Sequence, residues 1–373
     1  MKRSGGLIDP EAARHCSPTP YPVADEEPLL ASIIIVNYNA GEKLLRCLDS
    51  VARSIESDCE VVVVDNASTD GNAEKLSQRR DLLFIRSETN LGFGAGCNLG
   101  ARRSRAKYLI FLNPDTTVEA GWIEALLAPL ESCDRAGLAT ARILLAKSPE
   151  RINACGNRIH ITGITLCRGL GMTRDDFPEV EEVDAVSGAA FAVRRELFEM
   201  LDGFDEETFL YMEDTDLSLR ARLAGWRTLY APQSIVYHDY SLRITPRKVF
   251  YQERNRYLML LKTLRWPTLV AMLPVLMLAE IITWGFVILR DRDNIGNKWQ
   301  AYAWIFANRR ALVRKRAATQ SLRRARDREI LRRTAYRLEF EQAATGAVAA
   351  VARFVFNPVF FLLRAIILIV VWW

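Results

Sequence analysis

The sequence has no Cys-x-x-Cys pair, although its 373 residues include seven cysteines. An odd number of scattered cysteines fits poorly with the disulfide framework of a secreted protein, so we expect a reducing compartment. An apolar run of the kind that begins a signal peptide is also missing, because residues 1–30 start with basic residues and continue rich in Pro and Glu. We expect these residues to form a loose N-terminal tail.

Two common phosphate-binding motifs are absent as well. No Walker sequence occurs, and Gly94, Gly96 and Gly100 are spaced one residue too widely for the dinucleotide fingerprint. They also follow the third expected strand, whereas the fingerprint follows the first. A glycine-rich helix start can bring backbone N–H groups to an anion, but tight packing of a helix would also explain these glycines.

The sequence does contain a regular alternation of strands and helices. Four short apolar runs, at residues 32–36, 60–64, 82–85 and 108–112, are separated by segments with helical spacing. Continuous runs rich in Val and Ile are typical of parallel strands that are covered on both faces. This pattern predicts an α/β domain with a Rossmann-like nucleotide-binding sheet, in which ligands bind beyond the carboxyl ends of the strands.

Further elements of this domain are expected between residues 186 and 238. The apolar residues 186–193 predict a strand, residues 213–224 predict a helix that stops at Gly225, and residues 227–238 predict a last strand. The domain would therefore span residues 31–245.

The composition changes in residues 246–373. Residues 269–289 and 351–373 are apolar, and the first stretch is long enough to cross a hydrocarbon core of about 30 Å. Residues 290–337 carry fifteen Arg and Lys against four Asp and Glu. We expect C-terminal membrane-associated helices whose basic part binds anionic lipid. The pattern is compatible with both a spanning and an interfacial placement of residues 269–289.

Two carboxylates occur where expected strands end. Asp65 follows the second strand and can accept hydrogen bonds from a nucleobase or ribose. Asp115 follows the fourth strand and can hold a divalent cation through oxygen, although Pro114 could equally mark an ordinary turn. His238, one of three histidines, ends the last strand. A lone histidine is usually structural, but imidazole also suits Mn²⁺ and related ions.

Three acids gather at the start of the helix expected from residue 213. Glu213, Asp214 and Asp216 are electrostatically favoured near a helix N-terminus and need no function there. The preceding residues 203–212 include several large apolar side chains, which indicates partial burial of the acids. A partly desolvated carboxylate near an acceptor hydroxyl is a suitable general base.

Six motifs occur in a characteristic order over about residues 31–260. They are Ile33-Ile34-Ile35-Val36-Asn37-Tyr38-Asn39, Val64-Asp65-Asn66-Ala67-Ser68-Thr69-Asp70-Gly71, Asn90-Leu91-Gly92-Phe93-Gly94, Asn113-Pro114-Asp115, Gly203-Phe204-Asp205 and Glu213-Asp214-Thr215-Asp216-Leu217. In this order they resemble family 2 glycosyltransferases of the GT-A fold, particularly the rhamnosyltransferase-like branch. Each motif alone is unspecific, and the set is highly specific.

The resemblance implies a donor site. Asn37 and Asp65 would contact the nucleoside, and Asn90 and Gly92 would shape the donor pocket together with Asn113. The family's usual metal motif is Asp-x-Asp, and here Asn113 replaces the first Asp, which leaves one charge fewer for the cation.

The resemblance also implies a metal and an acceptor site. Asp115 would bind Mg²⁺ or Mn²⁺ with support from His238, and Asp214 would be the general base. Gly188 and Glu213 would lie at the acceptor. Arg254-Asn255 resembles a segment that follows the catalytic domain in relatives.

The implied reaction is an inverting transfer of a sugar, with a preference for rhamnose, from a dTDP- or UDP-sugar to a hydroxyl. The acceptor would be a lipid-linked or cell-surface polysaccharide intermediate. We expect the enzyme at the bacterial inner membrane, with its catalytic domain on the cytoplasmic face and membrane lipid as a partner.

Two other functions would require features that are absent from the segments where they are expected. A sugar nucleotidyltransferase predicts a glycine-rich loop after the first strand, and residues 37–44 contain only Gly41. A non-catalytic, membrane-bound nucleotide- or nucleic-acid-binding protein needs aromatic side chains among its arginines, and residues 312–333 contain none. We therefore expect no nucleic-acid partner.

Overall fold

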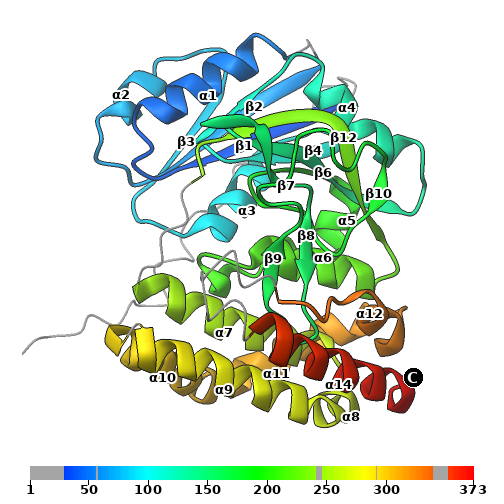
Figure 1. Ribbon diagram of the computed structural model, residues 1–373. Coiled ribbons are helices and arrows are strands. Elements are labelled where there is room, and N and C mark those ends of the chain that lie inside the picture. Colours follow the sequence, from blue (N-terminus) through cyan, green and yellow to red (C-terminus); the bar gives the residue numbers. More distant parts are fainter. Residues whose placement is uncertain (1–28, 56–57, 241–245, 291, 339–351) are drawn as a thin grey trace, which may run out of the picture.

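The computed structural model describes residues 29–55, 58–240, 246–290, 292–338 and 352–373. The loose tail expected over residues 1–30 lies outside the described residues except for its last two. Figure 1 shows a sheet domain above a layer of helices that the C-terminal part of the chain forms.

Ten strands of the described chain form one mixed sheet. β1 (Ala31–Asn37) lies between β2 (Cys59–Asn66) and β4 (Tyr108–Leu112) and is parallel to both, and β3 (Leu83–Ser87) is parallel to β2. The sheet changes direction beyond β4, where β11 is antiparallel to it. The remaining strands are β5 (Thr116–Val118), β6 (Ala136–Leu145), β7 (Ser148–Ala154), β10 (Glu181–Glu182), β11 (Ala190–Arg194) and β12 (Arg227–His238).

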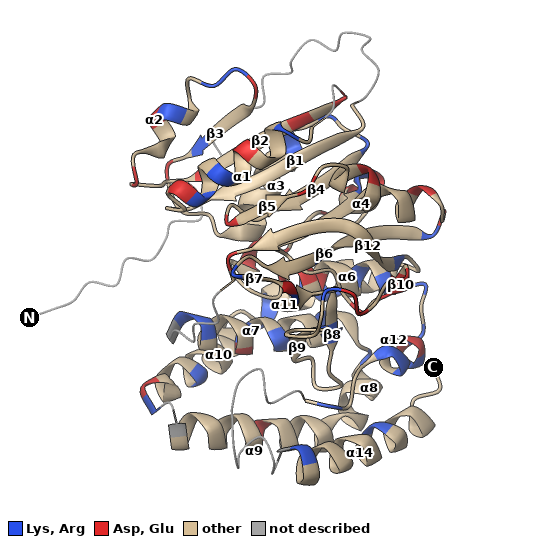
Figure 2. Ribbon diagram, turned by 45° about the horizontal axis from the view of Figure 1, so that its top comes forward, with Lys and Arg blue, Asp and Glu red and all other residues tan. Residues whose placement is uncertain are grey.

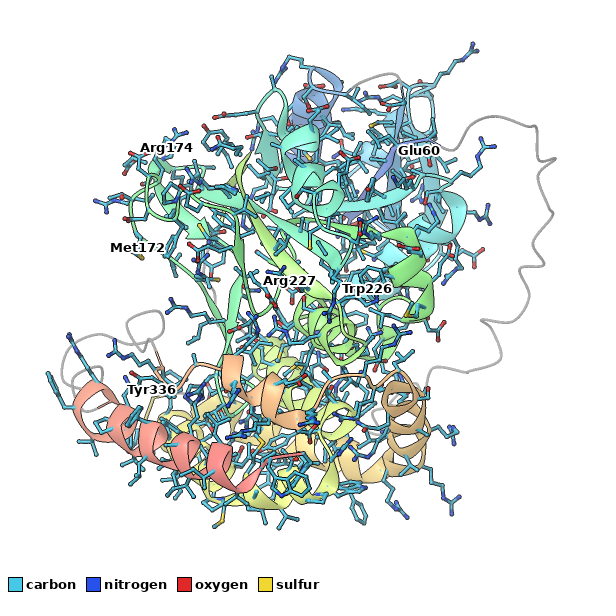
Figure 3. The ribbon with its side chains drawn as sticks, turned by 90° about the vertical axis from the view of Figure 1, so that its right-hand side faces the viewer. Glu60, Met172, Arg174, Trp226, Arg227 and Tyr336 are labelled. Atoms are coloured by element: carbon cyan, nitrogen blue, oxygen red, sulfur yellow. The ribbon has the colours of Figure 1, made fainter. Side chains whose placement is uncertain are left out.

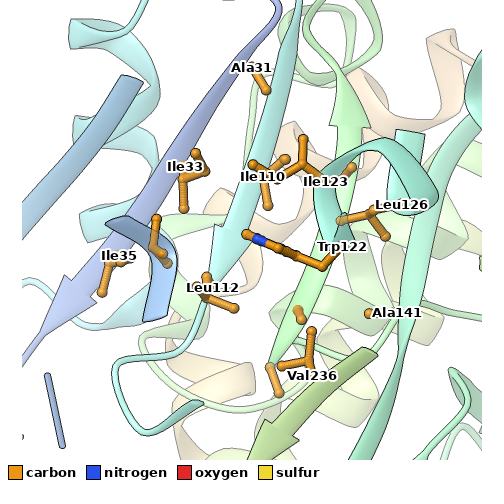
Figure 4. Packing of buried hydrophobic residues seen from close by; sticks show 14 of the residues in the cluster. Ala31, Ile33, Ile35, Ile110, Leu112, Trp122, Ile123, Leu126, Ala141 and Val236 are labelled. Carbon is orange, nitrogen blue, oxygen red and sulfur yellow. The ribbon is translucent and has the colours of Figure 1, made fainter. Parts of the chain in front are cut away.

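Helices cover both faces of this sheet because successive strand residues point to opposite sides. Ile33 and Ile35 of β1 pack in one cluster with α1 and α4 (Figure 4), whereas Ile34 and Val36 pack in another with α3, α5 and α6. The predicted α/β fold is therefore confirmed. The helices are α1 (Glu42–Ala52), α2 (Asn72–Leu76), α3 (Phe93–Arg103), α4 (Trp122–Glu131), α5 (Arg195–Met200) and α6 (Glu213–Leu223).

The glycines of α3 let this helix lie directly against the sheet. A Cβ atom on Gly96 would lie 2.8 Å from Val36 Cγ1, and one on Gly100 would lie 2.6 Å from Ile34 Cγ2. Both distances are too short for real contacts, so close packing explains these glycines without a phosphate-binding role.

A layer of helices follows residue 246. A hydrophobic cluster joins them to α6 and to the hairpin of β8 (Asn157–Ile159) and β9 (Thr165–Cys167). The helices of this layer are α7 (Pro246–Thr263), α8 (Trp266–Ala271), α9 (Leu273–Arg290), α10 (Ile295–Ala307), α11 (Arg309–Ser321), α12 (Asp327–Arg333) and α14 (Asn357–Val370).

Two sequence-based boundaries differ from the structure. The strand expected over residues 186–193 begins only at Ala190. The apolar residues 269–289 do not form one helix, because α8 ends at Ala271 and α9 begins at Leu273. Pro274 has no N–H to bond the preceding turn, which accounts for the break. By length and composition, the described helix Arg353–Val370 is apolar enough to cross a membrane.

Candidate active site

The candidate site lies where parallel strands of the sheet end. Asn37 of β1 is paired in register with Asp65 of β2, and Asn113 directly follows β4. Because these strands run in the same direction, their polar end residues meet at one edge of the sheet, as the sequence predicted. The residue before β11 joins this edge through the main chain, since Asn113 N donates to Ala189 O at 2.9 Å.

Asn37 and Asp65 form a buried hydrogen-bonded pair. Asn37 Nδ2 donates to Asp65 Oδ1 at 2.8 Å and to Ser68 Oγ at 3.0 Å, while Ser68 N donates to Asp65 Oδ2 at 3.1 Å. Both side chains have no exposed surface. The pair therefore holds the ends of β1 and β2 together, and each carboxylate oxygen keeps a second lone pair for a further donor.

Asn90 and Gly92 form a tight turn before α3. Asn90 Oδ1 accepts from Gly92 N at 2.9 Å, and Gly92 has a φ of 85°, which favours glycine. A Cβ atom on Gly92 would lie 2.3 Å from Phe209 O, and Phe93 N donates to that same oxygen at 2.8 Å. This turn is thus fastened to the loop that leads into α6.

Asp115 and His238 come together at the same edge of the sheet. His238 Nε2 lies 3.2 Å from Asp115 Oδ1, and His238 Nδ1 lies 2.8 Å from Asn153 Oδ1. When Nδ1 carries the proton of a neutral ring, Nε2 presents a lone pair towards the carboxylate. A hydrogen bond on the second ring nitrogen is typical of metal-binding histidines.

This donor set fits a divalent cation. A carboxylate oxygen and an imidazole nitrogen are both suitable ligands for Mn²⁺. No group of three or more His, Cys, Asp or Glu side chains that could hold a metal occurs in the part of the chain that the structure describes. A cation at Asp115 and His238 would therefore take its other ligands from a diphosphate and water, which is the usual arrangement for Mg²⁺ in phosphate sites.

Asp214 is held firmly at the start of α6. Its Oδ2 accepts from Gly188 N at 2.7 Å and from Asn157 Nδ2 at 3.2 Å, and its Oδ1 accepts from Thr215 N at 2.6 Å. Burial raises the pKa of Asp214 above its usual value. Gly188 thus contacts Asp214 itself, and a Cβ atom there would lie 3.2 Å from Oδ2.

The two neighbouring acids differ from Asp214. Burial, reinforced by the charge of Asp214, raises the pKa of Glu213 to about 8, and Glu213 Oε2 has no hydrogen-bond partner among the described residues. Asp216 instead contacts Arg220 at 2.7 Å and Lys262 at 2.8 Å. Although burial opposes ionisation, these cations lower the pKa of Asp216. Asp216 is therefore an internal ion-pair partner.

The loop before α6 has an unusual backbone that α7 stabilises. Phe209, Tyr211 and Met212 have positive φ angles of 59°, 68° and 69°. Asn255 Nδ2 donates to three carbonyl oxygens of this loop, those of Thr208 at 3.0 Å, Leu210 at 3.1 Å and Tyr211 at 2.7 Å. Arg254 Nη2 donates to Glu207 O and to Thr208 O at 2.8 Å.

Sequence reasoning missed Asn153 and Asn157. Asn153 lies in β7 and Asn157 begins β8, and neither belongs to a motif. Their contacts to His238 and Asp214 span 85 and 57 residues, so no local signal could have identified them. The resemblance singled out Arg254 and Asn255. Only the structure shows that their side chains hold the loop before α6.

Known proteins resemble this chain in sequence. The profile described as Glycosyl transferase family 2 matches residues 32–200. The N-acetylglucosaminyl-diphospho-decaprenol L-rhamnosyltransferase of Mycobacterium tuberculosis is 32% identical over 231 residues, which cover 55% of this chain and 75% of that protein. The chain belongs to glycosyl transferase family 2. The dTDP-rhamnosyl transferase RfbF of Shigella flexneri is 27% identical to this family 2 chain over 243 residues, covering 61% of this chain and 79% of that protein.

Solved structures support the same fold. The crystal structure of GalNAc-T7 with UDP, GalNAc and Mn²⁺ has a TM-score of 0.53 at 22% identity, covering 63% of this chain and 48% of that chain. The crystal structure of S. aureus TarS 1-349 in complex with UDP-GlcNAc also has a TM-score of 0.53, at 16% identity, covering 91% and 88%. The resemblance to family 2 glycosyltransferases with rhamnosyltransferase homologues, expected from the motifs, is confirmed.

Proposed function

We propose that this glycosyltransferase moves a sugar, rhamnose by preference, from a dTDP- or UDP-sugar to a hydroxyl of a lipid-linked glycan, with inversion at the anomeric carbon. The observation that carries the proposal is the fixed carboxylate of Asp214 beside the strand ends, with a pKa raised by burial. The M. tuberculosis relative is by name a rhamnosyltransferase of a diphospho-decaprenol substrate, which supports both the sugar and the acceptor.

Asp214 removes the proton of the acceptor hydroxyl in the proposed reaction. The acceptor oxygen then bonds to the anomeric carbon while the bond from that carbon to the diphosphate oxygen breaks. The N–H of Gly188 and the amide of Asn157 orient Oδ2 of the base. A raised pKa makes the carboxylate a stronger base than an exposed aspartate.

The donor would bind at the ends of β1, β2 and β4. Asn37 and Asp65 would contact its nucleoside, and Asn90, Gly92 and Asn113 would line its pocket. A divalent cation, Mg²⁺ or Mn²⁺, held by Asp115 and His238 would neutralise charge on the leaving nucleoside diphosphate. Gly188 and Glu213 would border the acceptor.

The proposed location is the bacterial inner membrane, with residues 31–245 as the transferase domain on the cytoplasmic face. Residues 246–373 would form the membrane-associated region, and its apolar helix Arg353–Val370 supports this assignment. Several cations of the basic segment contact carboxylates inside the protein, including Lys298, Lys315 and Arg323. These three cations are therefore engaged inside the protein, and we propose no nucleic-acid partner.

Release of nucleoside diphosphate from a panel of nucleotide-sugars tests the proposal. Detergent-solubilised protein with Mg²⁺ or Mn²⁺ and a lipid-linked acceptor should release it from one donor class. Asp214→Asn should lower kcat by about 10²–10⁴-fold because the base is lost, and Asp115→Ala should weaken the dependence on added metal.

Asp134→Asn, an exposed acid on the loop before β6, is the matched control and should keep the parent rate. Unchanged turnover in the folded Asp214→Asn variant would contradict the assignment of the base. If the parent protein released no nucleoside diphosphate from any donor, the proposed transfer to a lipid-linked acceptor would be contradicted.

A further inference from the structure

The outer faces of α9 and α14 carry a continuous set of exposed apolar side chains. In α9 these recur at Leu273, Met277, Ile281 and Ile288, and the exposed fractions of the middle two are 63% and 66%. Spacings of four and seven residues place all of them on one helix face. No described element packs on this face. The corresponding side chains of α14 are Val359, Leu362, Ile366, Ile369 and Val370.

The inner faces of both helices are packed on the protein. Val275 and Leu276 of α9 and Phe360 and Ile367 of α14 are buried in the same hydrophobic cluster. Figure 2 shows α9 and α14 as the outermost elements on the side away from the sheet, coloured almost entirely tan. Each helix is therefore apolar on both sides, with one side covered by protein. We name the uncovered side, formed by the exposed apolar residues of α9 and α14, the apolar platform.

Both ends of α14 are fastened to the body of the protein. Asn357 Oδ1 accepts from Leu338 N at 2.9 Å at the start of the helix. Beyond its end, Trp373 Nε1 donates to Thr268 Oγ1 at 2.8 Å, and Arg328 N donates to Trp373 O at 3.2 Å. Length alone would allow the helix Arg353–Val370 to cross a membrane, so the contacts at its ends decide its placement. With both ends on the protein side, α14 does not reach across.

Charged contacts hold the middle of α9 in the same way. Glu280 lies halfway along this helix, and its carboxylate contacts Arg256 of α7 at 2.5 Å and Lys298 of α10 at 3.1 Å. A helix that crossed a bilayer would have to give up these contacts at its midpoint. The contacts instead keep α9 along the surface of the helical layer.

Positive charge adjoins the platform beside α14. A cavity of about 540 Å³ is lined by Arg337 and Arg353 together with the aromatic rings of Tyr336, Phe354 and Phe361. Arg337 and Arg353 are exposed, and Tyr336 lies beside the start of this red helix in Figure 3. Guanidinium groups next to exposed apolar side chains match the phosphates and acyl chains of an anionic phospholipid surface.

We propose that α9 and α14 lie in the plane of an anionic bilayer, with the apolar platform in one leaflet and no segment between Leu273 and Trp373 of the described chain crossing it. The inference deepens the membrane partner of the proposed function. It does not depend on sugar transfer, because binding and topology are measured without a donor.

Flotation of the full chain with vesicles tests the surface. The parent should float with vesicles of phosphatidylcholine and phosphatidylglycerol. Ile281→Gln combined with Ile366→Gln should lower the partition coefficient at least about tenfold, since two exposed apolar side chains that would insert into the leaflet are lost. The control combines Met172→Gln with Val180→Gln, which are exposed in the sheet domain away from the helices (Figure 3 labels Met172) and should float like the parent.

Charge and topology give two further readouts. Arg337→Gln combined with Arg353→Gln should weaken binding to the anionic vesicles by about fivefold per arginine and leave binding to pure phosphatidylcholine unchanged.

For topology, Ser321→Cys and a cysteine added after Trp373 should both react with an impermeant maleimide from the cytoplasmic side, compared with the unsubstituted chain.

Each part of the proposal has its own contradicting result. Labelling of the two cysteines from opposite sides of the membrane would overturn the in-plane placement, and this result does not require the platform variants to fold. Undiminished flotation of the platform variant would overturn the assigned surface, and an unchanged arginine variant would overturn the anionic partner. A parent that floats but releases no nucleoside diphosphate would contradict only the proposed sugar transfer.

Discussion

At the residue scale, three neighbouring acids of α6 have three different environments. Glu213 is buried without a partner for Oε2, Asp214 accepts the N–H of Gly188, and Asp216 contacts Lys262. A helix N-terminus favours all three carboxylates, so tertiary contacts make the difference. Because Glu213 holds its proton at neutral pH, Asp214 does not face a second full charge in the site.

Glu213 should make the stability of the protein depend on pH. Its pKa is about 8 in the folded chain against an ordinary value of 4.5, so the folded state binds the extra proton between these values. The stability it contributes is complete below about pH 4.5 and is lost as pH rises through about 8. In Glu213→Gln this loss should vanish, which changes the difference in Tm between variant and parent by at least about 2 °C across the range.

Thermal unfolding at pH 5, 6.5 and 8 measures this effect. Glu196→Gln, on the exposed side of α5, should retain the pH dependence of the parent. Parallel curves for the parent and Glu213→Gln would mean that the buried carboxyl keeps an ordinary pKa.

The sequence predicted the positions of Asp65, Asp115 and Asp214 at strand ends and at a helix start, because these features are local. The resemblance assigned the base to Asp214, but the residue pattern alone did not separate Asp214 from Asp216, since the lysine that neutralises Asp216 lies 46 residues further along the chain in α7. The supporting Asn157 was missed for the same reason. Long-range contacts decide which of several equivalent acids remains available for chemistry.

At the element scale, α7 supports the loop that positions α6. Positive φ angles at Phe209, Tyr211 and Met212 cost free energy for residues other than glycine. The side chain of Asn255 compensates by satisfying three carbonyls of the loop. The same loop packs against Gly92, so it connects the expected donor pocket to the proposed base.

Asn255→Ala should therefore disturb catalysis more than binding. Removing the amide takes this donor from the carbonyls of Leu210 and Tyr211, at a cost of about 1–3 kcal/mol. If the loop relaxes, Asp214 shifts, and kcat should fall about 10–100-fold with a small change in KM for the donor. Steady-state kinetics of nucleoside diphosphate release, with pH profiles of kcat, provide the measurement.

Gln252→Ala replaces an exposed amide on the same helix and serves as the control, with kinetics expected to match the parent. A variant Asn255→Ala that lost stability but retained kcat and its pH profile would show that the loop contacts only support folding.

Most elements followed from sequence periodicity, but two boundaries depended on context. Residues 186–189 were expected to continue the strand, yet Gly188 donates its N–H to Asp214 and not to a neighbouring strand. The break between α8 and α9 follows from Pro274. The apolar character of residues 269–289 alone does not predict this break.

At the scale of the whole molecule, ion pairs connect the helical layer to the sheet domain. Lys262 of α7 contacts Asp205 at 2.5 Å and Asp216 at 2.8 Å, and all three side chains are nearly fully buried. Lys315 of α11 also contacts Asp205. The charge asymmetry of the sequence suggested a lipid partner for the basic segment, whereas the structure shows that part of this charge holds the two layers together.

Lys262→Met should be strongly destabilising. The substitution keeps the length of the side chain but leaves two buried carboxylates short of a cation, and breaking such buried pairs costs about 3–5 kcal/mol. Urea unfolding at pH 7 measures the loss. Arg102→Met, which removes an exposed pair with Glu206, should cost less than about 1 kcal/mol. Equal stability of the two variants would contradict a structural role for Lys262.

The Lys262 contacts have a geometric consequence for the choice of acceptor. They join α7 to α6, the helix that carries Asp214, and the contact between Arg256 and Glu280 joins α7 to α9, so packed helices connect the proposed base to the apolar platform. With the platform in the membrane, the base stands at a constant height above the lipid phosphates. The protein would then select lipid-linked glycans by length. It would use those whose reactive hydroxyl reaches that height, and it would not use shorter or longer glycans.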